Sequence, residues 1–265
     1  MVCIPRNIDT HSPSRSGLSL YNKVRSLKQA TITIESEILT QSVRSPFVQP
    51  LLLAMAIPAL SHKAHTLDEF HRLTGFVSKK TTKLVLEYLL IRGIGRVSRL
   101  GYSFSRADRI RVALLAILRG NDIERVSNFL SWQDFEAFAS ALLDISGYAT
   151  ECNLHFSKPT RMQIDVLGFN HNSGLAIVID CKHWKRNQLS AISLYARKQA
   201  QRTSNLLIHR RMISRAVPVV LTIHPVDMRL VDGVPVVPVS KFSSFIQEIP
   251  FYLDDEIESI CLDNT

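Results

Sequence analysis

The sequence predicts an α/β protein in which a mixed sheet flanked by helices follows a smaller α+β domain. One observation is the succession of apolar, strand-like segments between residues 148 and 240, which a long helical segment interrupts. Another is the series of helical segments with clear start and stop signals between residues 46 and 120. A chain of 265 residues, 46% of them hydrophobic, is long enough for two such domains. We expect a partly flexible N-terminal extension over 1–44 and domains over 45–120 and 121–265.

Within the smaller domain, polar residues mark where each helix begins. Thr66 and Glu69 have the spacing of a capping box, so a helix begins after Thr66, and Gly75 ends it. Ser78 caps the next helix, and Gly93 ends that one. The other elements expected here are a helix over 51–60, two short strands within 94–105 and an amphipathic helix over 106–120.

The larger domain begins with helices and continues with strands. Two helical segments fit residues 122–148, and the second is capped by Ser131 and stopped at Gly147. The segments that follow are apolar strands within 148–156, 162–170 and 173–184, a long helix near 191–207, strands within 216–225 and 234–240, and a final helix in "KFSSFIQEI". This order of helix, three strands, helix, two strands and helix predicts the mixed sheet.

Charge and composition narrow the class of protein. The formal net charge is +9 and the sequence pI about 9.6, and such a surplus of cations attracts polyanions such as nucleic acid or an anionic membrane. Two prolines, Pro50 and Pro58, interrupt the longest apolar run, which is shorter than the roughly 20 residues of a membrane-spanning helix. We expect no secretory signal, because the first residues are polar. The four cysteines lie far apart and indicate free thiols in a reducing compartment, so we expect a cytoplasmic protein with no membrane partner.

The segment "LAIVIDCKHWKR" (175–186) is an apolar strand that ends in charged residues. Side chains two residues apart on a strand share a face, so Asp180 and Lys182 point the same way. If this strand pairs with the preceding one around a tight turn, Asp165 comes to lie beside Asp180. Two facing carboxylates repel unless a cation compensates them, and Mg²⁺ suits oxygen ligands. The simpler alternative is a solvated ion pair between Asp180 and Lys182, worth about 0 to 1 kcal/mol.

These residues resemble the PD-(D/E)xK nuclease superfamily. An Asp, a spacer and an Asp-x-Lys at a strand end follow a helix that carries a Glu, and "IDCKHW" is similar to the corresponding segment of Mrr-like restriction endonucleases and archaeal Holliday-junction resolvases. The resemblance covers about residues 128–250. It implies a restriction-endonuclease-like fold and hydrolysis of phosphodiester bonds with Mg²⁺, for which Mn²⁺ substitutes. The residues it implies for the site are the metal ligands Asp165, Asp180 and Glu136, the catalytic Lys182 and the polar Gln199 on the following helix.

The order of elements over about residues 46–119 resembles a winged-helix domain. In that family the third helix enters the major groove and the hairpin contacts phosphates. The resemblance places Lys79, Lys80 and Lys83 of the third helix and Arg96 and Arg99 of the hairpin against DNA. A winged helix with a structural or protein-binding role, in which the lysines only solvate a helix start, is the alternative.

A further basic face follows the predicted site, with Lys198 and Arg202 as its candidate DNA contacts. Together the two resemblances predict a Mg²⁺-dependent DNA endonuclease of restriction or of DNA repair and recombination. The alternatives are a catalytically inactive, nuclease-like DNA-binding regulator and a branched-DNA resolvase that works as a homodimer.

Overall fold

The computed structural model describes residues 47–157, 161–183, 189–210, 212–226, 230–253 and 260–261. Of the two units into which the chain divides, the second, Arg44–Thr265, contains all of the described residues. The extension predicted over residues 1–44 lies outside the described residues. The domain boundary predicted near residue 120 falls inside the second unit and stays a prediction.

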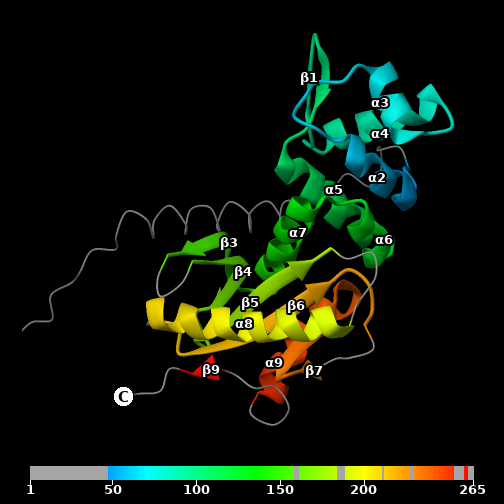
Figure 1. Cartoon of the computed structure of the whole chain (residues 1–265). Helices are drawn as coiled ribbons and strands as arrows, with labels where there is room; N and C mark the ends of the chain where they lie inside the picture. Colours follow the sequence, from blue (N-terminus) through cyan, green and yellow to red (C-terminus); the bar gives the residue numbers. More distant parts are fainter. Residues whose placement is uncertain are drawn as a thin grey trace, which may run out of the picture. The chain divides into compact units, whose positions relative to one another are not determined.

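The first part of the described chain consists of helices and one hairpin, in the order that the sequence predicts (Figure 1). Its elements are α2 (Pro50–Ala56), a short 3-10 helix (Ile57–Ala59), α3 (Leu67–Thr74), α4 (Lys79–Ile91), β1 (Arg96–Ser98), β2 (Gly101–Ser103) and α5 (Arg106–Leu118). The capping box is confirmed, because the amide of Glu69 donates to Thr66 Oγ1 at 3.2 Å and the amide of Thr66 donates to Glu69 Oε2 at 2.8 Å. Gly75 ends α3 with a φ of 63°, which glycine adopts without strain.

The remainder of the described chain is a mixed α/β structure, as the sequence predicts. Its elements are α6 (Ile123–Asn128), α7 (Trp132–Ile145), β3 (Ala149–Phe156), β4 (Met162–Asn170), β5 (Leu175–Lys182), α8 (Leu189–His209), β6 (Arg215–Thr222), β7 (Leu230–Val231), β8 (Val234–Pro238), α9 (Val239–Tyr252) and β9 (Ile260–Cys261). The described strands form a seven-stranded sheet in the order β3-β4-β5-β6-β8-β7, and β9 pairs with β6. The strands β3, β4 and β5 pair antiparallel, whereas β5, β6 and β8 pair parallel.

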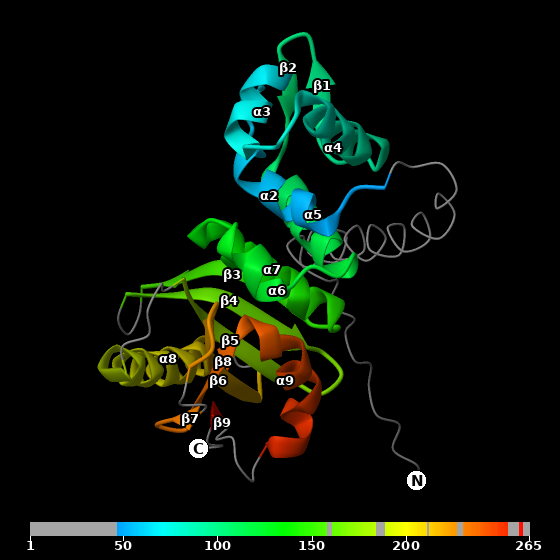
Figure 2. The same cartoon turned by 90° about the vertical axis from the view of Figure 1, so that its right-hand side faces the viewer.

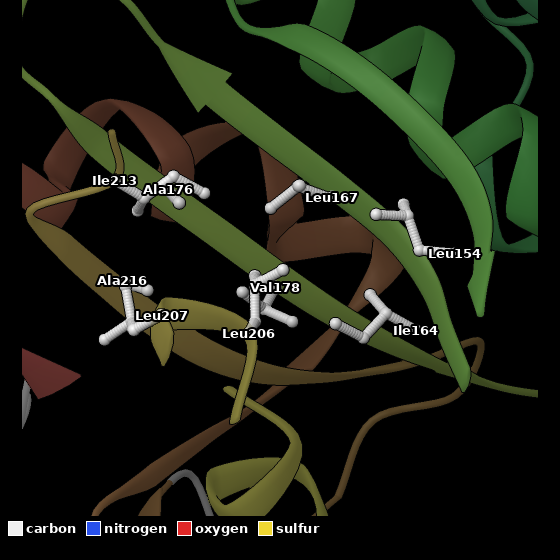
Figure 3. Close-up of a cluster of buried hydrophobic side chains, with 9 residues drawn as sticks. All are labelled: Leu154, Ile164, Leu167, Ala176, Val178, Leu206, Leu207, Ile213 and Ala216. Atoms are coloured by element: carbon white, nitrogen blue, oxygen red, sulfur yellow. The ribbon is translucent and has the colours of Figure 1, made fainter. Parts of the chain in front are cut away.

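Helices flank this sheet, with α7 and α8 on opposite sides of β3 and β4 (Figure 2). The face toward α8 is apolar, and Figure 3 shows its cluster of buried side chains. The cluster consists of Leu154, Ile164, Leu167, Ala176, Val178, Leu206, Leu207, Ile213 and Ala216. Because side chains alternate along a strand, the β5 face that carries Ala176 and Val178 continues with Asp180 and Lys182. The cluster therefore leads directly to the charged end of β5.

A buried ion pair holds α7 against α5. Asp134, 4% exposed, lies in the first turn of α7 and accepts hydrogen bonds of 3.0 Å from both Nε and Nη2 of Arg109. The hydroxyl of Ser131 caps the same turn by accepting from the amide of Asp134 at 3.2 Å, as the sequence predicts. Since Glu136 lies two residues beyond Asp134, this junction also fixes the start of the helix that carries Glu136.

None of the helices within the described ranges is both long enough and apolar enough to cross a membrane.

Candidate functional site

The charged end of β5 lies beside the middle of β4. The antiparallel register of β4 and β5 ends at the pair Val166 and Ile179, and one further step along it brings Asp165 opposite Asp180. The carboxylate of Asp165 continues the pairing, because its Oδ2 accepts a 2.8 Å hydrogen bond from the amide of Cys181. The predicted proximity of the two aspartates is therefore confirmed.

Asp165 also lies where the pairing of β4 with β3 is irregular. Cys152 pairs with Val166 and Leu154 with Ile164, but Asn153, the residue opposite Asp165, has a φ of 55°. This left-handed conformation is uncommon for a residue other than glycine, although asparagine tolerates it best. Such strain inside a strand is typical of functional sites.

Glu136 reaches the same region from α7. It is 2% exposed, and burial together with the negative charge of Asp165 raises its pKa to about 7. Burial and the charge of Asp180 also raise the pKa of Asp165, against the hydrogen bond from the Cys181 amide. The charge of Asp165 thus opposes the ionisation of Glu136, and the charge of Asp180 opposes that of Asp165.

Two cations compensate Asp180, which is 3% exposed. Lys182 Nζ lies 2.5 Å from Oδ2, and Arg202 Nη1 donates to Oδ1 at 2.8 Å. The side chains of Lys182 and Arg202 are 15% and 26% exposed, so neither contact is a solvated surface ion pair. The simpler alternative considered for Asp180 and Lys182 is therefore wrong.

Three residues on one face of α8 contact β5. Gln199 is fully buried, and its Nε2 donates to the carbonyl of Val178 at 2.8 Å. Lys182 Nζ lies 4.4 Å from the ring centroid of Tyr195, a cation–π contact. Tyr195, Gln199 and Arg202 are spaced i, i+4 and i+7, which places them on one side of the helix. Gln199 thus fixes α8 on β5, while Tyr195 contacts Lys182 and Arg202 contacts Asp180.

The kinds of donor atom at this site fit a hard divalent cation. Glu136 Oε1 and Asp180 Oδ2 are buried oxygens without a hydrogen-bond donor, and the contact of Lys182 with Oδ2 is an ion contact without hydrogen-bond geometry. Carboxylate oxygens are the ligands that Mg²⁺ and Mn²⁺ prefer. Across the part of the chain that the structure describes, no three His, Cys, Asp or Glu side chains are arranged to hold a metal ion. In this arrangement Lys182 and Arg202 supply the positive charge instead.

The side chains predicted to contact DNA lie mostly at the surface. Lys79 forms an exposed ion pair with Asp68 at 2.8 Å, and Lys83 forms one with Glu87 at 3.7 Å. Four others are exposed: Lys80, Arg96, Arg99 and Lys198. Arg202 differs from them, because it points to Asp180.

The sequence did not indicate that Tyr195 and Asn153 lie at this site, and it predicted Arg202 as a DNA contact. The signal for Tyr195 and Arg202 was available, since both share the helical face of Gln199. No pattern in the sequence marks Asn153, whose conformation follows from strand pairing.

No protein-family model matches the chain, and no curated protein matches it. Weakly similar solved structures include protein VC1899 from Vibrio cholerae (12% identity, TM-score 0.33) and Can2 from Sulfobacillus thermosulfidooxidans in complex with cyclic tetra-adenylate (12%, 0.32). Another is the Thermococcus gammatolerans assembly of McrB hexamers with bound McrC (14%, 0.30). The matches cover 86%, 85% and 77% of this chain but only 56%, 55% and 52% of theirs, so it spans just over half of their length. At these TM-scores the likeness carries no argument about function.

Proposed function

We propose that the protein is a metal-dependent DNA endonuclease of the restriction-endonuclease-like kind. The observation that carries the proposal is a buried Asp165 that lies near both Glu136 and Asp180, with Lys182 in contact with Asp180. Burying three carboxylates is unfavourable for folding, because each loses hydration and the negative charge of Asp165 lies near those of Glu136 and Asp180. A site that retains them against this cost suits a function that needs them together.

Each residue has a distinct part in the proposed reaction. Glu136, Asp165 and Asp180 are the carboxylates that would hold Mg²⁺, and they would have to rearrange to do so, because among the described residues no three such side chains are arranged to hold a metal ion. The bound ion would supply positive charge to a phosphodiester and its attacking water. Lys182, held by Asp180 and the ring of Tyr195, orients the water toward the phosphorus. Buried Gln199 holds α8 on the strand by donating to the carbonyl of Val178.

DNA is the substrate class that the charge of the protein favours. The net charge of +9 attracts a polyanion, and exposed cations of α4 and of the β1–β2 hairpin suit phosphate contacts. We assign residues 45–120 to a winged-helix module that holds the duplex. Lys79, Lys80 and Lys83 lie on its third helix, and Arg96 and Arg99 on its hairpin.

Cleavage assays on a panel of linear duplex, flap and four-way junction DNA, with Mg²⁺ or Mn²⁺, test this function. Asp165→Ala and Lys182→Ala should abolish cleavage and leave DNA binding largely intact. Asp232→Asn is the matched control, because Asp232 forms an exposed ion pair with Arg197 away from the site. Cleavage that survives Asp165→Ala and Lys182→Ala would overturn the assignment, and preference for the junction would identify a resolvase, which works as a homodimer.

A DNA-binding regulator without nuclease activity is the second candidate. The specific observation in its favour is that Asp180, a proposed metal ligand, contacts a cation at both carboxylate oxygens. This candidate predicts DNA binding that is independent of divalent cations and no cleavage of any substrate in the panel.

A further inference from the structure

Asp180 already has two positively charged partners within the protein. Its two oxygens contact two different cations, Lys182 from the same strand and Arg202 from α8. Two carboxylates of the site, Asp165 and Asp180, therefore face two basic side chains. A divalent cation that binds here adds charge to a group that is already compensated.

The position of Arg202 follows from the packing of α8. Gln199, three residues earlier, is fully buried and bonds the carbonyl of Val178 at 2.8 Å. Three residues along a helix lie on the same side, so this bond also directs Arg202 toward β5. Arg202 Nη1 meets Asp180 Oδ1 at 2.8 Å as a result.

We propose that Arg202 is an internal counterion of Asp180 that competes with the divalent cation for this carboxylate and so sets the affinity of the site for metal. The inference deepens the proposed function and rests on it for the identity of the site. Arg202 is a positioning and regulating residue here rather than a contact to DNA.

Arginine and lysine differ as competitors for a carboxylate. A buried lysine can lose its proton and its charge, whereas the guanidinium of arginine stays charged in proteins. Arg202 can therefore yield to a cation only by moving away from Asp180. Its side chain is 26% exposed, compared with 15% for Lys182, so it has the more direct access to solvent. We infer that cation binding displaces Arg202 and leaves Lys182 in place.

Calorimetric titration with Mn²⁺, in the absence of DNA, tests the proposal on wild type and three variants. Arg202→Gln removes the competing charge and should lower the dissociation constant for Mn²⁺ on the order of tenfold, as expected for one unit charge in a partly solvated site. Arg202→Lys keeps a charge that can be released with a proton, so its dissociation constant should lie between those of wild type and Arg202→Gln. Arg197→Gln is the matched control, because Arg197 lies on the same helix, is 73% exposed and pairs with Asp232 at 2.7 Å. It should not change the affinity.

Mn²⁺ binding by Arg202→Gln that equals or is weaker than that of wild type would overturn the proposal, as would the absence of binding in every protein. If Arg202→Gln fails to fold, Arg202→Met, which fills a similar volume without charge, replaces it with the same expectation. The titration contains no DNA, so its outcome is separate from the cleavage assay. Tighter Mn²⁺ binding without cleavage of any substrate would support the counterion and reject the nuclease.

Discussion

The raised pKa of Glu136 makes the stability of the protein depend on pH in a direction that can be worked out. Burial and the charge of Asp165 raise this pKa from 4.5 to about 7, so the folded state holds the proton more tightly than the unfolded state. The stabilisation that this proton provides is complete below pH 4.5 and is lost as the pH rises through about 7. At about 1.4 kcal/mol for each pKa unit, the total loss is about 3 kcal/mol, most of it between pH 5 and 8.

The substitution Glu136→Gln isolates this effect, because glutamine resembles protonated glutamate in shape and cannot ionise. Urea unfolding of wild type and variant at pH 5 and at pH 8, with a chelator present, gives the difference in free energy of unfolding at each pH. The variant should gain about 2 to 3 kcal/mol relative to wild type between pH 5 and pH 8.

The control for this experiment is Glu248→Gln, since Glu248 is exposed on α9. Its difference from wild type should be the same at both pH values. If the difference for Glu136→Gln were also constant, within about 1 kcal/mol, Glu136 would be ionised in the folded protein at pH 5 and the argument from burial would be refuted.

Two further predictions concern the residues that hold the helices and the hairpin in place. Gly101→Ala should lower the free energy of unfolding by more than about 2 kcal/mol, because φ is 122° and the added Cβ would lie 2.2 Å from the carbonyl oxygen of His65. Gly75→Ala, at a φ of 63° in open space, should lower the free energy of unfolding by only about 1 kcal/mol. Thermal unfolding of both variants measures the two losses, and equal losses would contradict the steric explanation. Asp134→Ala should cost about 3 to 5 kcal/mol in urea unfolding, because Arg109 loses its buried counterion. The double variant Asp134→Ala/Arg109→Met should recover part of that loss, and a double variant less stable than Asp134→Ala would argue against the unpaired charge as its cause.

Local signals in the sequence predicted most of the helices, because a cap depends on residues only three apart. Thr66, Ser78 and Ser131 begin helices as expected. The helix expected over 51–60 is shorter, ending at Ala56 before a 3-10 turn that contains Pro58. Proline lacks the amide hydrogen that a continuing α-helix needs, so this end was also available from the sequence.

The long, apolar strands and the two short strands of the β1–β2 hairpin were predicted, whereas the two-residue strands were missed. The strands β7 and β9 have two residues each, too few for any periodic pattern. Their pairing with β8 and β6 depends on where the sheet edges lie in the folded chain. Tertiary structure, rather than local preference, decides such elements.

The site divides in the same way between local and long-range information. The proximity of Asp165 and Asp180 could be predicted from the sequence, because a tight turn joins their strands and fixes the register. The partner of Asp180 on α8 depends on how that helix is rotated against the sheet, and the predicted place of Gln199 in the site was the one indication of that rotation. Once Gln199 is known to face Val178, the position of Arg202 follows from helical geometry.

The assignment of Arg202 to Asp180 changes where the proposed function must find its contacts to DNA. A cation that is bound to a buried carboxylate contributes little to the field outside the protein. Lys198 remains exposed on α8, but the exposed cations of α4 and the hairpin then carry more of the phosphate binding. Their ion pairs, such as that of Lys79 with Asp68, are solvated on both sides and worth little, so phosphate can displace them. Under the proposed function, DNA affinity and metal affinity would therefore depend on different arginines and lysines, so that each could be altered without the other.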